Sequence, residues 1–136
     1  MKELFQIAKE NNILVEYVRI PDAQSCCACD GNGEIVLMDY SLVFSAAKER
    51  VHFAHELGHC VQGAFYCDDT AFDDRRRHEA KATRWAIQQL VPLAELRIAV
   101  RQEYIDEWQL AEYFCVTPEF MHAALEYWTV TRGDIL

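Results

Sequence analysis

The stretch His55-Glu56-Leu57-Gly58-His59 decides how this chain of 136 residues is interpreted. On an α-helix each residue rises about 1.5 Å and turns about 100°, so His55 and His59 lie one turn apart on one face. Both imidazoles can then reach a single metal ion, and Glu56 lies beside that face, where it can act on a water molecule at the metal. The pattern H-E-x-x-H therefore predicts a metal centre, provided that the residues around it form a helix.

The surrounding residues favour a helix over residues 45–62. This segment contains no proline, and its apolar residues recur at three- and four-residue steps, as in an amphipathic helix. Gly63 supplies a signal for the end of the helix. Gly58 lowers helix propensity by about 1 kcal/mol relative to Ala, and a glycine there allows another element to pack close against the helix. The alternative is a helix whose two histidines only satisfy hydrogen bonds. His52, three residues before His55, is predicted to be solvated or to support the site without being a ligand.

Two histidines do not complete a metal site, so a third ligand is expected downstream. Residues 73–90 read as a second long helix, which opens with acidic residues and ends just before Pro92. His78 and Glu79 are adjacent candidates, but neighbours on a helix diverge by about 100° and do not aim at one point. Small residues share the face of Glu79 and would let this helix pack tightly against the first one, which favours Glu79 and leaves His78 as the alternative.

The two helices together resemble those of the ImmA/IrrE family of zincin-like metallopeptidases. Members of that family carry H-E-L-G-H on one helix, followed by a helix that reads roughly E-A-x-A-x-x-F-A-x-x-L-L-x-P. In this chain the second pattern reads E-A-K-A-T-R-W-A-I-Q-Q-L-V-P from Glu79 to Pro92, with Trp85 where the family more often has Phe and Gln89 where it more often has Leu. The resemblance extends over about residues 37–120.

This resemblance implies a site and an activity. Carried over position by position, it implies that His55, His59 and Glu79 bind zinc and that Glu56 is the general base. It also implies a small α+β domain with zinc metallo-endopeptidase activity inside the cell. Known members act on helix-turn-helix repressors of mobile elements or stress responses, so a protein of that class is the expected substrate.

Composition and charge limit the other classes of function. A chain of this length is most simply one domain, residues 1–136, and its formal net charge of −9 repels nucleic acid and suits a basic protein partner. No stretch approaches the length of a membrane span. The first ten residues carry charges where a signal peptide would need an apolar centre, so we expect a cytoplasmic protein.

Two further groups of residues each have a functional and a structural interpretation. Cys26, Cys27 and Cys29, with Cys67, are a conceivable second metal site, although C-x-x-C spacing occurs here only once; the alternative is a strand with free thiols. Tyr66 is a candidate to stabilise the oxyanion because it follows the motif closely, but a single tyrosine there is more often a packing residue.

The remaining pattern predicts an α+β fold of the zincin-like type. Turn residues 30–33 separate two of three expected strands, and the strands are predicted to form a small antiparallel sheet against the motif helix, with an edge that aligns a peptide in zincin-type sites. The expected strands cover residues 13–20, 25–28 and 34–39. The other expected helices cover residues 2–11, 93–103, 106–114 and 118–128.

A competing function is DNA binding, because residues 110–121 have the rhythm of a helix-turn-helix. The helix that would enter the groove, residues 118–128, contains Glu119 and Glu126 and no Lys or Arg, which argues against direct DNA binding. A third interpretation is a non-catalytic protein that binds a repressor through the same fold. Glu56 argues against it, because a purely structural metal site has no use for a base.

Overall fold

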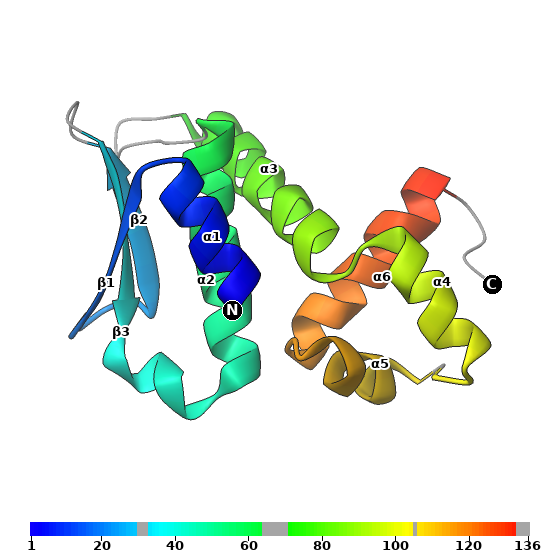
Figure 1. The fold of residues 1–136 in the computed structure, drawn as a ribbon. Coiled ribbons are helices and arrows are strands. Elements are labelled where there is room, and N and C mark those ends of the chain that lie inside the picture. The colour runs from blue at the N-terminus through cyan, green and yellow to red at the C-terminus, as the bar shows by residue number, and fades with distance from the viewer. Residues whose placement is uncertain (30–32, 64–70, 105, 133–136) are drawn as a thin grey trace.

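A three-stranded sheet followed by a series of helices makes up the fold in the computed structural model, which describes residues 1–29, 33–63, 71–104 and 106–132. Two helices pack on the sheet, and a long third helix connects this part to the C-terminal helices (Figure 1). The α+β class predicted from the sequence is therefore confirmed. The elements are α1 (Lys2–Glu10), β1 (Ile13–Val18), β2 (Ser25–Cys29), β3 (Glu34–Asp39), the 3-10 helix η1 (Tyr40–Phe44), α2 (Ala46–Gln62), α3 (Phe72–Leu90), α4 (Leu93–Arg101), α5 (Glu107–Phe114) and α6 (Pro118–Arg132).

The sheet has the order β1-β3-β2 and is mixed, which corrects the prediction of an antiparallel sheet. Strands β2 and β3 pair antiparallel, as their turn residues predicted, but β1 pairs with β3 in parallel. The chain that leaves β1 crosses the end of β3 to reach the far edge. Asp39 at that end fixes the crossing, because its carboxylate accepts a hydrogen bond from the amide of Ile20 (2.7 Å) and its own amide donates to the carbonyl of Gln24 (2.8 Å).

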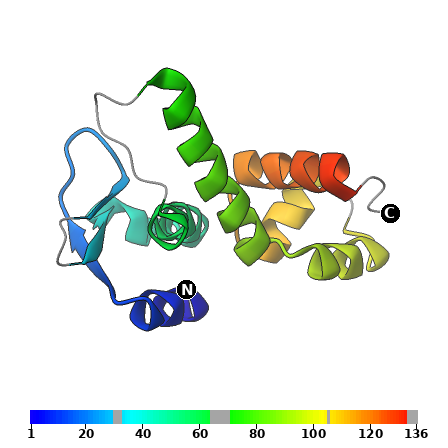
Figure 2. The same cartoon turned by 90° about the horizontal axis from the view of Figure 1, so that it is seen from above.

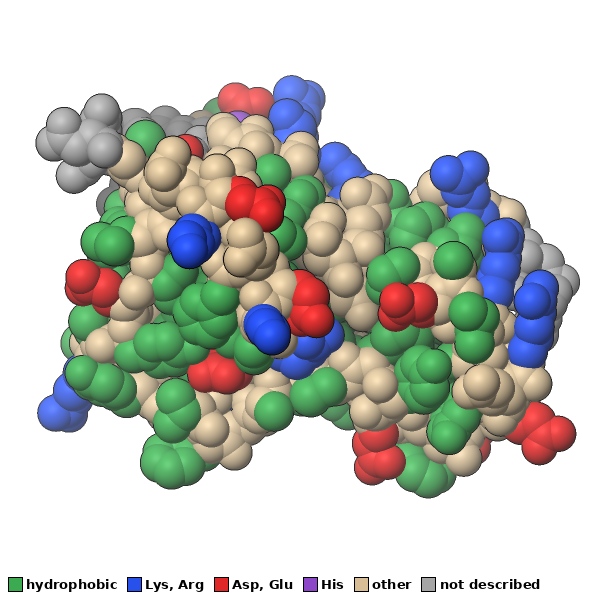
Figure 3. All heavy atoms as spheres, viewed as in Figure 1, with side chains coloured by type: hydrophobic (Ala, Val, Ile, Leu, Met, Phe, Trp, Pro, Cys, Tyr) green, Lys and Arg blue, Asp and Glu red, His purple; other side chains and the backbone are tan. Residues whose placement is uncertain are grey.

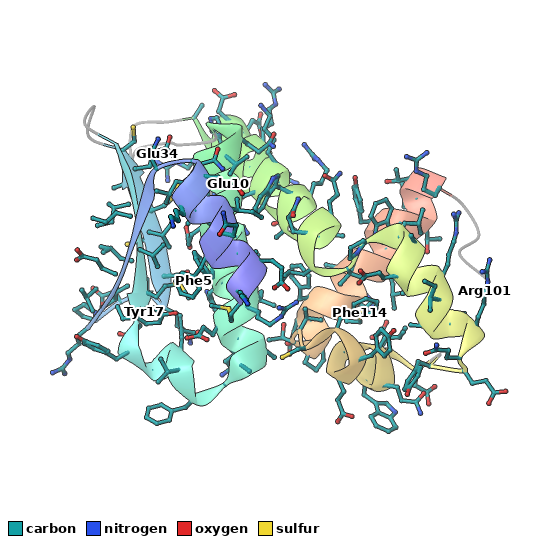
Figure 4. All side chains as sticks on the ribbon, viewed as in Figure 1. Phe5, Glu10, Tyr17, Glu34, Arg101 and Phe114 are labelled. Carbon is teal, nitrogen blue, oxygen red and sulfur yellow. The ribbon has the colours of Figure 1, made fainter. Side chains whose placement is uncertain are left out.

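Helices α1 and α2 cover one face of the sheet (Figures 1 and 2). The sheet and the two helices meet in a core that fully buries Val36 and Met38 of β3 together with Phe53 of α2. Phe5, labelled on α1 in Figure 4, lies edge-on against Phe53 with the ring centroids 4.9 Å apart. Alternate residues of β3 are therefore the platform that fixes the position of α2.

The ends of α2 follow from its sequence. The side chain of Ser45 accepts a hydrogen bond from the amide of Lys48 at the start of the helix. Gly63 ends it in the left-handed conformation, with φ of 62°. The predicted helix over residues 45–62 is thus confirmed, with Ser45 as its N-cap.

Helix α3 connects the sheet region to α4, α5 and α6 (Figures 1 and 2). Buried apolar side chains form one connected cluster that runs from Leu4 of α1 through Phe53 to Trp128 of α6. The buried indole of Trp128 donates a hydrogen bond to the carbonyl of Val91 at 2.8 Å, which ties α6 to the junction of α3 and α4. The predicted C-terminal helices are present, although α6 continues beyond the predicted residue 128 to Arg132. None of the described helices combines the length and apolar character that crossing a membrane requires.

Candidate metal centre

Helix α2 presents two functional faces. His55 and His59 face α3, whereas the turn-spaced residues His52, Glu56 and Cys60 lie on the side of β2. The two sets are offset by about one residue, or about 100° around the helix axis. One helix therefore brings two imidazoles to one neighbour and a carboxylate to the other.

The approach of α3 to α2 is set by Gly58. A Cβ atom at this position would lie 2.7 Å from the carbonyl oxygen and 3.0 Å from the Cα atom of Ala82. Only a glycine leaves room for such a contact between the two backbones. The small residues on both helices thus allow the close packing that was predicted, and this packing brings Glu79 within reach of the two histidines.

His55, His59 and Glu79 converge at this contact. Nε2 of His55 lies 2.7 Å from Oε2 of Glu79, and Nε2 of His59 lies 3.2 Å from Oε1. One possible ligand atom from each of the three residues falls within 4.8 Å of the other two. Within the described ranges no other group of three or more His, Cys, Asp or Glu residues meets this criterion, and His78 does not belong to the group. The structure thus brings together the three predicted ligands and leaves out the alternative.

The donor set fits a zinc ion. Two imidazole nitrogens and one carboxylate oxygen are a ligand combination of catalytic zinc sites, and bond lengths of about 2.0–2.2 Å place tetrahedral ligand atoms about 3.3 Å apart. The side chain of His59 is 5% exposed, while those of His55 and Glu79 are 26% and 42% exposed. An ion held there would therefore be anchored on a buried side and reachable from the other.

Thr83 supports His55 from the next turn of α3. Its hydroxyl oxygen lies 3.4 Å from Nδ1 of His55, while Nε2 of the same ring faces Glu79. A proton on Nδ1 that points to Thr83 leaves the lone pair of Nε2 for a metal. Sequence reasoning missed this contact, although Thr83 lies one turn after Glu79 and therefore on the same face.

Glu56 is buried beside the group, with 8% of its surface exposed. Its Oε2 accepts a hydrogen bond of 2.6 Å from the hydroxyl of Ser25, and the thiol of Cys27 also hydrogen-bonds to this carboxylate. Ser25 and Cys27 are alternate residues of β2, so both point to the same side of the strand, toward α2. The side chain of Glu56 thus lies between its own helix, α2, and the edge strand β2.

The cysteines of β2 do not gather into one cluster. Cys26 and Cys29 are exposed, whereas Cys27 is half-buried and hydrogen-bonds to the buried Cys60. This bond, together with burial and the nearby carboxylate of Glu56, raises the pKa of the Cys27 thiol, and burial raises the pKa of Cys26. Both thiols are therefore held in the protonated form, which is the weaker metal ligand. Two other candidates of the sequence, Tyr66 and Cys67, lie outside the described residues.

Comparison with known families agrees with this geometry. The model of the Peptidase_M78 family, described as the IrrE N-terminal-like domain, matches residues 32–126, which is well over half of the chain. The chain belongs to this family. The resemblance seen in the motif helices is thus confirmed, and the chain is a member of a family of metallopeptidases. Neither the curated proteins nor the solved structures gave a significant match.

The matched region contains η1, α2, α3 and most of the C-terminal helices, and so all four predicted site residues. Strands β1 and β2 precede it. The strand that supplies Ser25 is therefore a part of the site that the family match does not cover.

Proposed function

We propose that this member of the Peptidase_M78 family is a zinc-dependent metallo-endopeptidase. The observation that supports this most directly is the convergence of His55, His59 and Glu79, with Glu56 buried next to them. In the proposal the first three residues hold zinc and Glu56 is the general base. Residues 1–136 act as one domain, because one connected core joins the sheet region to the C-terminal helices.

Each residue has a separate task in the proposed reaction. A zinc ion held by the three ligands would polarise the scissile carbonyl and acidify a water molecule. Glu56 takes the proton of the attacking water and passes it to the leaving amine. The hydroxyl of Ser25 holds one oxygen of Glu56 in place while this happens. Thr83 keeps Nε2 of His55 directed at the centre.

The proposed substrate is a protein chain that reaches the site in an extended form. Strand β2 forms an edge of the sheet, pairs only with β3 among the described elements, and contacts α2. A peptide added to that edge would pass next to Glu56. We propose that the natural substrate is a cytoplasmic helix-turn-helix repressor of a mobile element or stress response. The net charge of −9 on this chain suits a basic protein partner.

Features of α6 speak against DNA binding as the function. His122 on this helix is placed between two carboxylates, with its Nδ1 2.7 Å from Glu107 and its Nε2 3.2 Å from Glu126. These exposed acidic groups would face the phosphates if α6 entered a groove. Figure 3 shows several basic side chains along one edge of the C-terminal helices, with acidic side chains on the same face.

The experiment compares the wild type with Glu56→Gln on one probe, the helix-turn-helix repressor encoded nearest to the gene. Both proteins are loaded with zinc and the products are followed by intact-mass spectrometry. We expect the wild type to cut the repressor and the variant to bind zinc equally but to cut at least about 10²-fold more slowly. A variant that cuts at the wild-type rate removes Glu56 from the mechanism. A wild type that binds the repressor without cutting it supports the non-catalytic alternative.

A further inference from the structure

His52 and Ser25 form a chain of hydrogen bonds that ends on Glu56. The hydroxyl oxygen of Ser25 lies 2.6 Å from Oε2 of Glu56 and 3.0 Å from Nδ1 of His52. His52 and Glu56 are one turn apart on α2, so Ser25 of β2 reaches both from the opposite side. None of these contacts involves His55, His59 or Glu79.

The single hydroxyl hydrogen of Ser25 fixes which group donates in each hydrogen bond of this chain. The serine hydroxyl has one hydrogen, which it donates to Oε2 of Glu56. Its contact with His52 therefore requires the ring to donate from Nδ1. Burial lowers the pKa of His52, so its ring is neutral at neutral pH, and a neutral ring that donates from Nδ1 carries no proton on Nε2.

We propose that His52 and Ser25 are positioning residues that hold the carboxylate of Glu56 in the orientation in which it accepts a proton, with His52 in the Nδ1–H form. This rests on the proposed function, since it concerns the same general base. The carboxylate of a glutamate can turn about the last of the three rotatable bonds of the side chain. The hydroxyl of Ser25, itself held by a hydrogen bond from His52, restrains this rotation. His52 acts only through Ser25, and Ser25 acts through the carboxylate of Glu56 and not on the substrate.

The first test is spectroscopic and needs no substrate. Long-range ¹H–¹⁵N spectra of the folded, zinc-loaded protein report which ring nitrogen of His52 carries the proton. We expect Nδ1–H in the wild type. In Glu56→Ala the serine loses its acceptor and donates to His52 instead, so the ring is expected to change to Nε2–H. A wild-type ring in the Nε2–H form, or a ring that stays Nδ1–H in Glu56→Ala, overturns the proposal even if the protein is an active peptidase.

The second test separates positioning from a purely structural contact between β2 and α2. Asn at position 52 places an amide donor near the position of Nδ1, whereas Gln places it near that of Nε2. Ser25→Ala and His52→Gln are expected to lower kcat about 10- to 100-fold on the repressor that the wild type cuts, with KM and zinc content unchanged. Ser25→Thr and His52→Asn, which keep the donors, are expected to stay near the wild-type kcat. A Ser25→Ala variant whose kcat is within twofold of the wild type rules out the positioning role.

Discussion

The backbone of Gly58 lies directly against that of Ala82, so closely that a methyl group on Gly58 would come within 2.7 Å of the Ala82 carbonyl oxygen. This contact lies one residue from His59 and three residues from Glu79 along their helices. It therefore fixes the distance between the helix that carries the two imidazoles and the helix that carries the carboxylate. A change in this contact acts on the site without removing any of its functional groups.

Gly58→Ala is expected to destabilise the protein and weaken metal binding. Alanine gains about 1 kcal/mol in helix propensity, but forcing a methyl group into close-packed backbone costs about 1–3 kcal/mol. Because the neighbour is backbone and not a flexible side chain, the second effect should prevail. We expect a net loss of about 1 kcal/mol in urea unfolding and a zinc affinity about 10-fold lower in competition with a chelator.

Gly63→Ala is the matched control for this prediction. Gly63 also has no side chain, but nothing lies within 4 Å of an added Cβ, and its strain comes only from a φ of 62°. Its replacement should cost about 1 kcal/mol and leave zinc affinity unchanged. Equal zinc affinities for Gly58→Ala and Gly63→Ala would contradict the role given to the Gly58–Ala82 contact.

Thr83→Val tests whether the hydroxyl next to His55 orients that ring. Valine keeps the shape of threonine and removes the oxygen that lies 3.4 Å from Nδ1. Loss of such a partner typically lowers metal affinity about 10- to 100-fold, and the length of this contact places the expected effect near the lower value. Thr83→Ser, which retains the hydroxyl, should bind zinc with nearly the wild-type affinity. An unchanged affinity in the valine variant would mean that the packing of α2 and α3 alone orients His55.

Tyr17→Phe is expected to change how stability depends on pH at alkaline values. The phenol of Tyr17, labelled at β1 in Figure 4, donates a hydrogen bond of 3.0 Å to Glu49 of α2. Burial, together with this carboxylate, raises the pKa of Tyr17 from 10 to about 12. Between these values the unfolded tyrosine ionises and the folded one does not. The contribution of Tyr17 is therefore complete below pH 10 and is lost as the pH rises to about 12.

The measurement is urea unfolding of both proteins from pH 8 to the highest pH at which they fold. At pH 8 the wild type should be more stable by about 1 kcal/mol, the usual net value of one hydrogen bond. This difference should shrink steadily above pH 10. A difference that stays constant across the range would show that the phenol of Tyr17 is not held by Glu49.

The sequence was most informative where local signals were strong. The helix that carries the H-E-x-x-H pattern, its end at Gly63 and the antiparallel pairing of β2 with β3 each depend on a few adjacent residues, and all are found where they were predicted. The parallel pairing of β1 was not predictable in this way. It depends on the crossing that Asp39 fixes between two segments of the chain, and no local pattern indicates which edge of β3 a strand will take.

In the site, too, the residues that follow from local spacing were predictable and those that depend on long-range packing were not. The three proposed ligands lie at fixed spacings within two helices, so face arithmetic and the resemblance together indicate them. Ser25 did not stand out, because a serine beside three cysteines in a strand has no spacing that relates it to Glu56. His52 lies three residues before His55 in the sequence, but its partner is on β2, and only the packing of that strand against α2 reveals the contact.

The central claim is that one metal ion is held by His55, His59 and Glu79. The most direct measurement is an anomalous difference map, recorded at the zinc edge, from crystals of the protein grown with zinc. We predict a single strong peak about 2.0–2.2 Å from Nε2 of both histidines and from a carboxylate oxygen of Glu79. A map without a peak between these three side chains, or with the zinc held by other residues, would contradict the account.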